Sequence, residues 1–300
     1  CLVGGSQQGL DFTARVLLNE GETIACEQPT YFGCFQAFGA SQPKYRAIPT
    51  DEEGILPEEL DKALAEDPSI RLIYVIPNFQ NPTGRTWSLA RRKAFMEVVN
   101  KYEIPVLEDD AYGELRYEGE HLPSLKSMDT KGLVIYSGSF SKIMCPGLRL
   151  AYLIAEEPIR KEIVGMKGNS DMHVPVSIEM MMDRYLDEND LDAHVANLVK
   201  VYREKRDVMV EAIREFFPKD CTFRVPEGGL FVWVSYPETY DSQKFFDEAG
   251  AQKVIFVQGE LFYADHPDTH TMRLNFSFAP PEKIREGIRR LGVALERAKK

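Results

Sequence analysis

The sequence predicts an α/β protein in which a mostly parallel sheet lies between helices, followed by a smaller α+β domain. Up to Ile154, short apolar runs alternate with segments of helical periodicity, which is typical of parallel sheets. Beyond it the pattern becomes helical and then mixes short strands with helices. The 300 residues suffice for two domains with sizeable cores. We expect residues 1–190 to form the large domain, 191–217 a linking helix and 218–300 the small domain.

The large domain contains five strand signals and two clear helix signals. The apolar runs that predict strands are Thr23–Cys26, Arg71–Ile76, Pro105–Glu108, Leu133–Ser137 and Leu150–Ile154. A helix is expected over Gly9–Asn19, and Gly21 suits its exit. Another is expected between the second and third strands, because Ser88 can cap it and Leu89, Met96 and Val99 share one face.

The second half opens with a long helix. Asn189–Phe217 carries an apolar stripe at helical spacing, so one helix is expected there. A further helix is expected near Ser242–Ala249, and the last helix should bury Ile284, Ile288, Leu291 and Leu295. Strands are expected at Thr222–Val225, Leu230–Val234, Val254–Phe256 and Met272–Phe276.

Composition argues against several classes of protein. The formal net charge is −11 and no block of lysine and arginine stands out, so no nucleic-acid partner is expected. No apolar run approaches the roughly 20 residues of a membrane helix, so no membrane partner is expected. Five scattered cysteines without a C-x-x-C pair favour free thiols in the cytoplasm. No metal site is expected.

The loop Ser139–Arg149 carries the strongest chemical signal. It holds Lys142 between two apolar strands, and partial burial lowers an amine pKa enough for Schiff-base chemistry. Neighbouring hydroxyls and Arg149 can hold a phosphate. A cofactor that has both an aldehyde and a phosphate, pyridoxal 5'-phosphate (PLP), fits this pair of functions. The alternative is a solvated lysine in a turn.

Three further loops follow strand-like runs. Gly4–Gly9 opens a helix whose backbone N–H groups, with the Ser6 hydroxyl, form an anion site, although such turns are common. Tyr31 follows the next strand and can stack on a flat ring, or belong to the core. Asn81 lies between two prolines at a sheet edge, where its amide can donate to a phenolate; the alternative is a plain turn.

The acidic run Glu108-Asp109-Asp110 ends another strand. A carboxylate here can pair with a protonated pyridine nitrogen, and Tyr112 can donate to the ring's 3'-oxygen. Adjacent strand residues point to opposite faces, and the three-residue step to Tyr112 selects Asp109 over Asp110. The alternative is an acidic pair that caps a helix.

These motifs in this order closely resemble the class I/II (fold-type I) PLP-dependent aminotransferases. The branch with 2-aminoadipate, aromatic and branched-chain aminotransferases matches best, from Cys1 to about Ala298. The resemblance implies a seven-stranded large-domain sheet, a cytoplasmic homodimer active in amino-acid metabolism, and PLP as cofactor. It implies transamination between an L-amino acid and a 2-oxo acid, with 2-oxoglutarate as the expected acceptor.

The resemblance also assigns residues. Lys142 matches the lysine that binds the cofactor and acts as base, Asp109 the partner of the pyridine nitrogen, and Asn81 and Tyr112 the donors to the 3'-oxygen. Tyr31 matches the stacking aromatic residue. Arg273 matches the arginine that binds the substrate α-carboxylate, with Asn81 beside it. The residues that match phosphate contacts are Ser6, Gln7, Ser139, Ser141 and Arg149.

The sequence departs from the family pattern at its N-terminus. Cys1 begins in what reads as an interior strand, so we expect an absent preceding segment that would carry part of the small domain and a contact to the partner subunit. On that view this chain would bind PLP weakly. The alternatives are another PLP reaction such as β-elimination, a PLP-binding effector domain of a transcriptional regulator, and an inert fragment.

Overall fold

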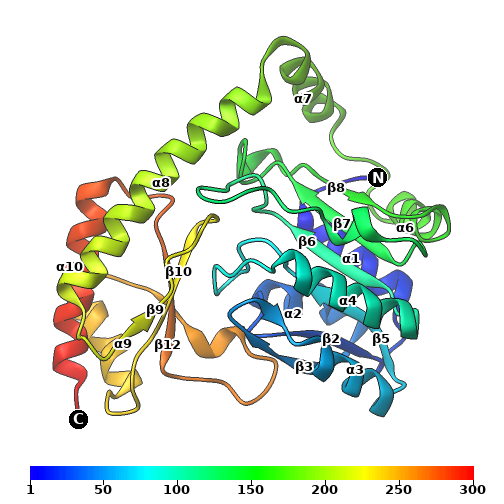
Figure 1. Ribbon diagram of the computed structural model, residues 1–300. Coiled ribbons are helices and arrows are strands. Elements are labelled where there is room, and N and C mark those ends of the chain that lie inside the picture. Colours follow the sequence, from blue (N-terminus) through cyan, green and yellow to red (C-terminus); the bar gives the residue numbers. More distant parts are fainter.

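The computed structural model describes residues 1–300 and contains two separate sheets (Figure 1). The larger sheet has eight strands in the order β1-β8-β7-β6-β5-β2-β3-β4. The strands are β1 (Leu2–Val3), β2 (Thr23–Gln28), β3 (Lys44–Asp51), β4 (Gly54–Ile55), β5 (Ile70–Val75), β6 (Val106–Asp110), β7 (Val134–Ser139) and β8 (Ala151–Ile154).

The sheet is mostly parallel, as the sequence predicts. Strands β3, β2, β5, β6 and β7 are mutually parallel, whereas β8 and β4 run antiparallel to their neighbours. The expected seven strands are joined by an eighth, β4, which forms a tight hairpin with β3. Gly54 allows this hairpin, because its φ of 102° is in a region that side chains rarely adopt and a Cβ there would meet Trp87.

Helices cover both faces of this sheet. One face packs against α1 (Ser6–Leu17), α2 (Phe32–Phe38) and α6 (Glu157–Ser170) in one buried cluster, and the other packs against α3 (Pro57–Glu66), α4 (Leu89–Tyr102) and α5 (Leu125–Met128) in a second. Strand β5 is apolar from Leu72 to Val75 because both of its faces are covered there. Leu72 and Tyr74 enter the first cluster, and Ile73 and Val75 enter the second.

The smaller sheet has the order β11-β12-β10-β9, with β9 (Thr222–Phe223), β10 (Phe231–Ser235), β11 (Val257–Gln258) and β12 (Thr271–Asn275). It packs with α9 (Ser242–Ala251) and α10 (Pro281–Ala298), and the four apolar residues predicted for the last helix are all buried there. In Figure 1, α8 (Leu191–Phe216) runs from this cluster to α7 (Val176–Glu188). Short 3₁₀ turns cover Gly39–Ser41, Pro146–Leu148 and Gly259–Phe262.

One predicted strand is wrong. Val254–Phe256 forms no ladder, and the edge strand β11 begins one residue later at Val257. The apolar signal has another cause: Phe256 is buried and stacks on Phe245 at 4.6 Å between ring centroids, while Ile255 is exposed. Side-chain packing therefore explains this run better than strand pairing does.

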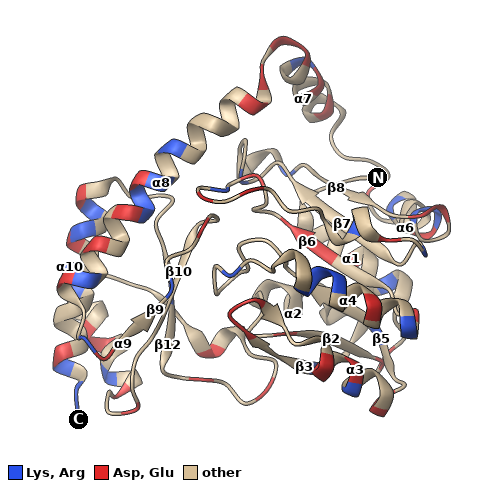
Figure 2. Ribbon diagram, in the orientation of Figure 1, with Lys and Arg blue, Asp and Glu red and all other residues tan.

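Several elements gave no clear signal in the sequence. Strand β3 alternates exposed and partly buried residues, so its pattern is that of a polar strand near the sheet edge. Helix α2 has only seven residues, too few to show a helical period. No helix in the structure combines the length and the apolarity that spanning a membrane requires. Charges of both signs are interspersed along α8 and α10 (Figure 2).

Candidate active site

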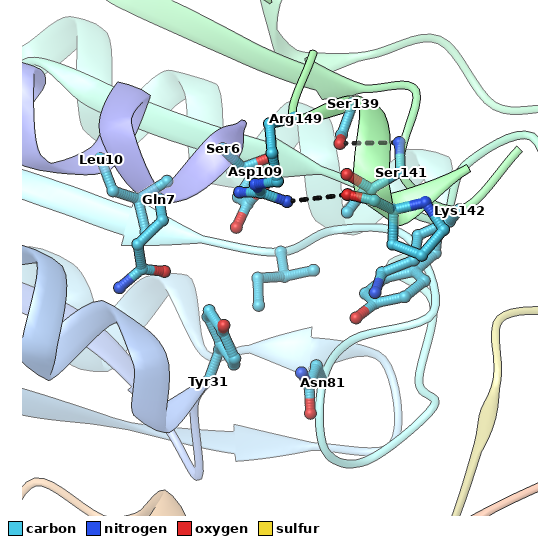
Figure 3. A pocket seen from close by; sticks show the side chains of 14 residues that line it. Ser6, Gln7, Leu10, Tyr31, Asn81, Asp109, Ser139, Ser141, Lys142 and Arg149 are labelled. Carbon is cyan, nitrogen blue, oxygen red and sulfur yellow. Dashed lines mark hydrogen bonds between the residues drawn. The ribbon is translucent and has the colours of Figure 1, made fainter. Parts of the chain in front are cut away.

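A cavity of about 150 Å³ lies at the carboxyl edge of the large sheet (Figure 3). Loops that follow β1, β2, β5, β6 and β7 all reach it, as expected for the ligand-binding edge of an α/β sheet. All ten residues predicted to bind the cofactor line it: Ser6, Gln7, Tyr31, Asn81, Asp109, Tyr112, Ser139, Ser141, Lys142 and Arg149. Leu10, Ile76, Ala111 and Pro146 complete the lining.

One end of the cavity combines a helix N-terminus with an arginine. Ser6 is the first residue of α1, so the N–H groups and the dipole of this helix favour an anion there. The Arg149 guanidinium contacts only backbone carbonyls, those of Gly4 and Pro146, at 3.4 and 3.3 Å. Gly5 has a φ of 95°, and a Cβ there would lie 2.0 Å from Arg149 Nη2. The close approach of Arg149 to this loop therefore requires glycine.

Side chains that the sequence did not single out hold this loop in place. Gln8 accepts a hydrogen bond from the Gly4 N–H at 2.7 Å and donates to Asp171 Oδ2 at 2.9 Å. Lys167, nearly fully buried, pairs with Asp171 at 2.8 Å. Gln7 lines the cavity, but its amide donates to the Gly33 carbonyl at 2.7 Å, so it joins α1 to α2.

Asp109 forms the buried floor of the cavity. Its Oδ2 accepts a hydrogen bond from the Tyr74 hydroxyl at 2.9 Å, whereas its Oδ1 is buried and has no partner. Burial raises the pKa of Asp109 to about 6, and Asp110 adds to this rise. An unpartnered buried carboxylate oxygen is costly unless a donor meets it, so the cavity fits a ligand with an N–H at this point.

The three acidic residues Glu108, Asp109 and Asp110 at β6 have different partners (Figure 2 shows their position). Asp110 turns away from the cavity and accepts hydrogen bonds from Asn78 and Tyr136 at 3.1 and 2.9 Å. Glu108 accepts from the N–H groups of Leu125 and Lys126, both at 2.9 Å, at the start of α5. The helix-capping alternative therefore applies to Glu108.

Lys142 lines the cavity, whereas Arg273, on β12 of the smaller sheet, is not part of the lining but contacts Asn81, which is. Burial lowers the pKa of the Lys142 amine, and the charges of Arg273 and Arg149 lower it further. Arg273, on β12, donates to Asn81 Oδ1 at 2.8 Å. Its guanidinium lies 4.3 Å from the ring centroid of Phe231 and 5.1 Å from that of Phe262. Its buried Nε has no partner, so donor capacity is left for a ligand.

Comparison with known proteins places this chain in a family. The family model described as aminotransferase class I and II matches residues 1–291. The chain belongs to this family. It is therefore a PLP-dependent aminotransferase of fold type I.

Three relatives illustrate the similarity. The aromatic-amino-acid aminotransferase 1 of Thermococcus litoralis is 39% identical over 97% of this chain and 71% of its own length. The 2-aminoadipate transaminase of Thermus thermophilus is 37% identical over 97% of this chain and 74% of its own. The crystal structure of Pyrococcus horikoshii kynurenine aminotransferase, a complex with PMP, superposes with a TM-score of 0.95 at 40% identity, over 100% of this chain and 75% of that one.

Buried hydrogen bonds of Glu27, Gln80 and Arg92 hold the loop that carries Asn81. Glu27, at the end of β2, accepts hydrogen bonds from the Ile76 N–H at 2.9 Å and from Trp87 Nε1 at 3.0 Å. Gln80 donates to the Pro29 carbonyl at 2.7 Å, and Arg92 donates to Asn78 at 2.6 Å. These contacts fix both ends of the loop that carries Asn81.

Glu27 should make the stability of the aminotransferase pH-dependent. Burial raises its pKa to about 7, so the folded chain keeps a proton that the unfolded chain releases above about pH 4.3. Its contribution to the free energy of unfolding therefore falls between about pH 5 and pH 7, by at most about 1.4 kcal/mol per unit. The free energy of unfolding is measured by urea titration of the apoprotein at several pH values. Glu27→Gln should reduce its fall with pH, whereas Glu120→Gln, at an exposed position, should not. An equal dependence of this free energy on pH in wild type and Glu27→Gln would contradict the prediction.

Proposed function

We propose that the cavity at the edge of the large sheet is the active site, with Lys142 as the base, and that the reaction pairs an L-amino acid with 2-oxoglutarate. One observation carries the proposal: the residues expected to contact PLP line a single cavity, with Asp109 Oδ1 free at its floor and Arg273 beside Asn81. When bound, PLP supplies an electron sink for charge that develops at the substrate Cα.

The residues divide the work by position. Asp109 Oδ1 is proposed to hold the proton at the pyridine nitrogen. Asn81 and Tyr112 are proposed to donate to the 3'-oxygen, and burial keeps the proton on Tyr112 by raising its pKa. Tyr31 is proposed to stack on the ring. Lys142, whose lowered pKa favours the neutral amine, is proposed to take the proton from the substrate Cα, and it would return a proton at the cofactor's aldehyde carbon.

The anion end is proposed to hold the phosphate. The N-terminus of α1 with Ser6, together with Arg149, offers backbone donors, a hydroxyl and a guanidinium on one side of the cavity. Ser139 and Ser141 add hydroxyls, and the Ser141 N–H already donates to Ser139 Oγ at 3.1 Å. Gln7 is proposed to contribute through its place on the first turn of α1.

Arg273 is proposed to bind the substrate α-carboxylate, with Asn81 holding one edge of its guanidinium. The rings of Phe32, Phe231 and Phe262 surround this arginine, and they restrict its orientation and exclude water. We propose that the amino donor is of the aromatic or 2-aminoadipate type, because relatives with those names share 37 to 39% of their residues with this chain.

A product assay tests this function. The holoenzyme is incubated with 2-oxoglutarate and a panel of aromatic, acidic and branched amino acids. Glutamate and the matching 2-oxo acid should appear in equal amounts. Ammonia and pyruvate without glutamate would instead indicate β-elimination. Bound PLP that responds to amino acids without any product would indicate an effector domain.

Arg273→Lys tests the carboxylate site. Lysine keeps the charge but loses the planar pair of donors, so the KM for the amino donor should rise about tenfold or more. PLP affinity should stay near that of the wild type. Arg285→Lys, at an exposed position paired with Glu215, is the matched control and should change neither constant. An unchanged KM in Arg273→Lys would reject the assignment.

We further propose the domain division 1–190, 191–217 and 218–300. Two sheets with separate buried clusters support it, and α8, which covers Leu191–Phe216, runs between them. Limited proteolysis should cut first within or beside α8. A first cut inside either sheet would contradict the division.

We also propose that the active protein is a cytoplasmic homodimer. Helix α7 supports a second copy as its partner, since Val176, Met180, Met181 and Leu186 are exposed on it. All five cysteines are free, which suits a reducing compartment. Light scattering on the holoenzyme should give twice the chain mass, and Met180→Glu should lower it toward one chain. A monomeric wild type would contradict the proposal.

A further inference from the structure

Tyr74 is a buried polar residue directly behind the cavity. It lies on β5, in the middle of the large sheet, and is fully buried. Its ring packs edge-on against Phe38 at 5.4 Å between centroids. Its hydroxyl donates to Asp109 Oδ2 at 2.9 Å, and no other partner serves that oxygen. A phenol buried this deeply needs such a partner, because an unpaired hydroxyl in the core is costly.

The strand register explains how the two residues meet. Tyr74 lies opposite Leu107 in the parallel pair β5–β6. Asp109 is two residues beyond Leu107, so its side chain points to the same face of the sheet. The long phenol reaches along that face to the carboxylate. Burial and the nearby Asp109 charge raise the pKa of Tyr74 well above its ordinary value, so the phenol keeps its proton and remains the donor.

We propose that Tyr74 is a positioning residue for the cofactor's ring nitrogen, acting through Asp109. It occupies Oδ2, which leaves Oδ1 as the carboxylate oxygen without a partner on a residue that lines the cavity. It also stabilises the ionised carboxylate in surroundings that otherwise favour protonation, because a hydrogen bond to a charged acceptor is strong. The inference rests on the proposed role of Asp109 and assigns the residue that makes this role possible.

The test compares two ligands in two variants. Apoprotein is titrated with PLP and with its 1-deaza analogue, in which a C–H replaces the ring nitrogen, and the Kd is measured by equilibrium dialysis. Wild type should prefer PLP. Tyr74→Phe should weaken PLP binding about tenfold, the loss expected for one hydrogen bond to a charged group, and should leave the Kd of the analogue nearly unchanged.

A matched control separates this effect from general damage to a core. Tyr236 is a buried tyrosine whose hydroxyl donates to the Thr269 carbonyl at 3.0 Å, in the cluster of the small sheet. Tyr236→Phe removes a hydrogen-bonded phenol of similar depth and should leave both affinities unchanged. Thermal unfolding of both variants shows whether each is folded under the conditions of the titration.

The outcomes distinguish the inferred role of Tyr74 from the proposed role of Asp109. A wild type that does not prefer PLP over the analogue would overturn the role of Asp109, and the inference with it. A wild type that prefers PLP, with the preference intact in Tyr74→Phe, would overturn the inference alone. Equal weakening of both ligands in Tyr74→Phe would also overturn it, because that result indicates packing rather than contact with the ring nitrogen's partner.

Discussion

Lys142→Ala should abolish covalent attachment of PLP and reduce turnover by about 10²–10⁴-fold, the range that a positioned general base contributes. The side chain is a partly buried amine with a lowered pKa at the edge of the cavity, and alanine can neither bind an aldehyde nor carry a proton. Borohydride reduction followed by mass measurement of the intact protein should show added PLP in wild type and none in the variant.

The control for this experiment is another lysine of the same domain. Lys131 is exposed and pairs with Glu103, and neither residue lines the cavity. Lys131→Ala should keep both the covalent link and the turnover. Added PLP mass on the Lys142→Ala protein after reduction would show that another residue forms the link, and the assignment would then be wrong.

Asp109→Asn should lower turnover by about 10²–10³-fold, comparable to the loss of a preorganised electrostatic group. The amide cannot carry the negative charge that would keep the pyridine nitrogen protonated. The same substitution at the neighbouring residue provides the control. Asp110→Asn changes a carboxylate that binds Asn78 and Tyr136 outside the cavity, so its effect on turnover should be small.

The measurement for this pair is kcat with saturating PLP, donor and acceptor. Thermal unfolding of both variants separates catalysis from folding, because each asparagine replaces a carboxylate that accepts hydrogen bonds in the folded chain. Equal losses of turnover at the two positions, or a larger loss at Asp110, would reverse the choice between them.

Local chemistry explains why so much of this site could be predicted. Apolar runs that end in Gly, Pro, Asn or Asp mark strands that pass into loops, and in a parallel sheet these loops meet at one edge. The order of motifs around Ser6, Asn81, Asp109 and Lys142 predicted a shared cavity, and all four residues line it. The choice of Asp109 over Asp110 rested on the alternation of side chains along a strand and on the three-residue step to Tyr112. Asp109 lines the cavity, and Asp110 does not.

One prediction failed on a misleading local signal, and three features were missed because the sequence carries no local signal for them. The run Val254–Phe256 has strand-like composition, but its buried aromatic ring serves the core rather than a ladder. Strand β3 and helix α2 were missed because one is largely polar and the other short. Glu27 gave no signal because its partners, Ile76 and Trp87, lie 49 and 60 residues further along the chain.

The sequence alone determined the fold class, the family and most of the residues that line the cavity, because those depend on local periodicity and on short motifs. Only the tertiary structure decided which side chains act together. Arg273 and Asn81 are 192 residues apart and meet through the packing of two sheets, and Tyr74 and Asp109 are 35 residues apart and meet through strand register. In the sequence, Tyr74 is one more apolar residue of a buried strand. Its hydroxyl acquires a specific partner only when folding removes water and leaves Asp109 as the acceptor.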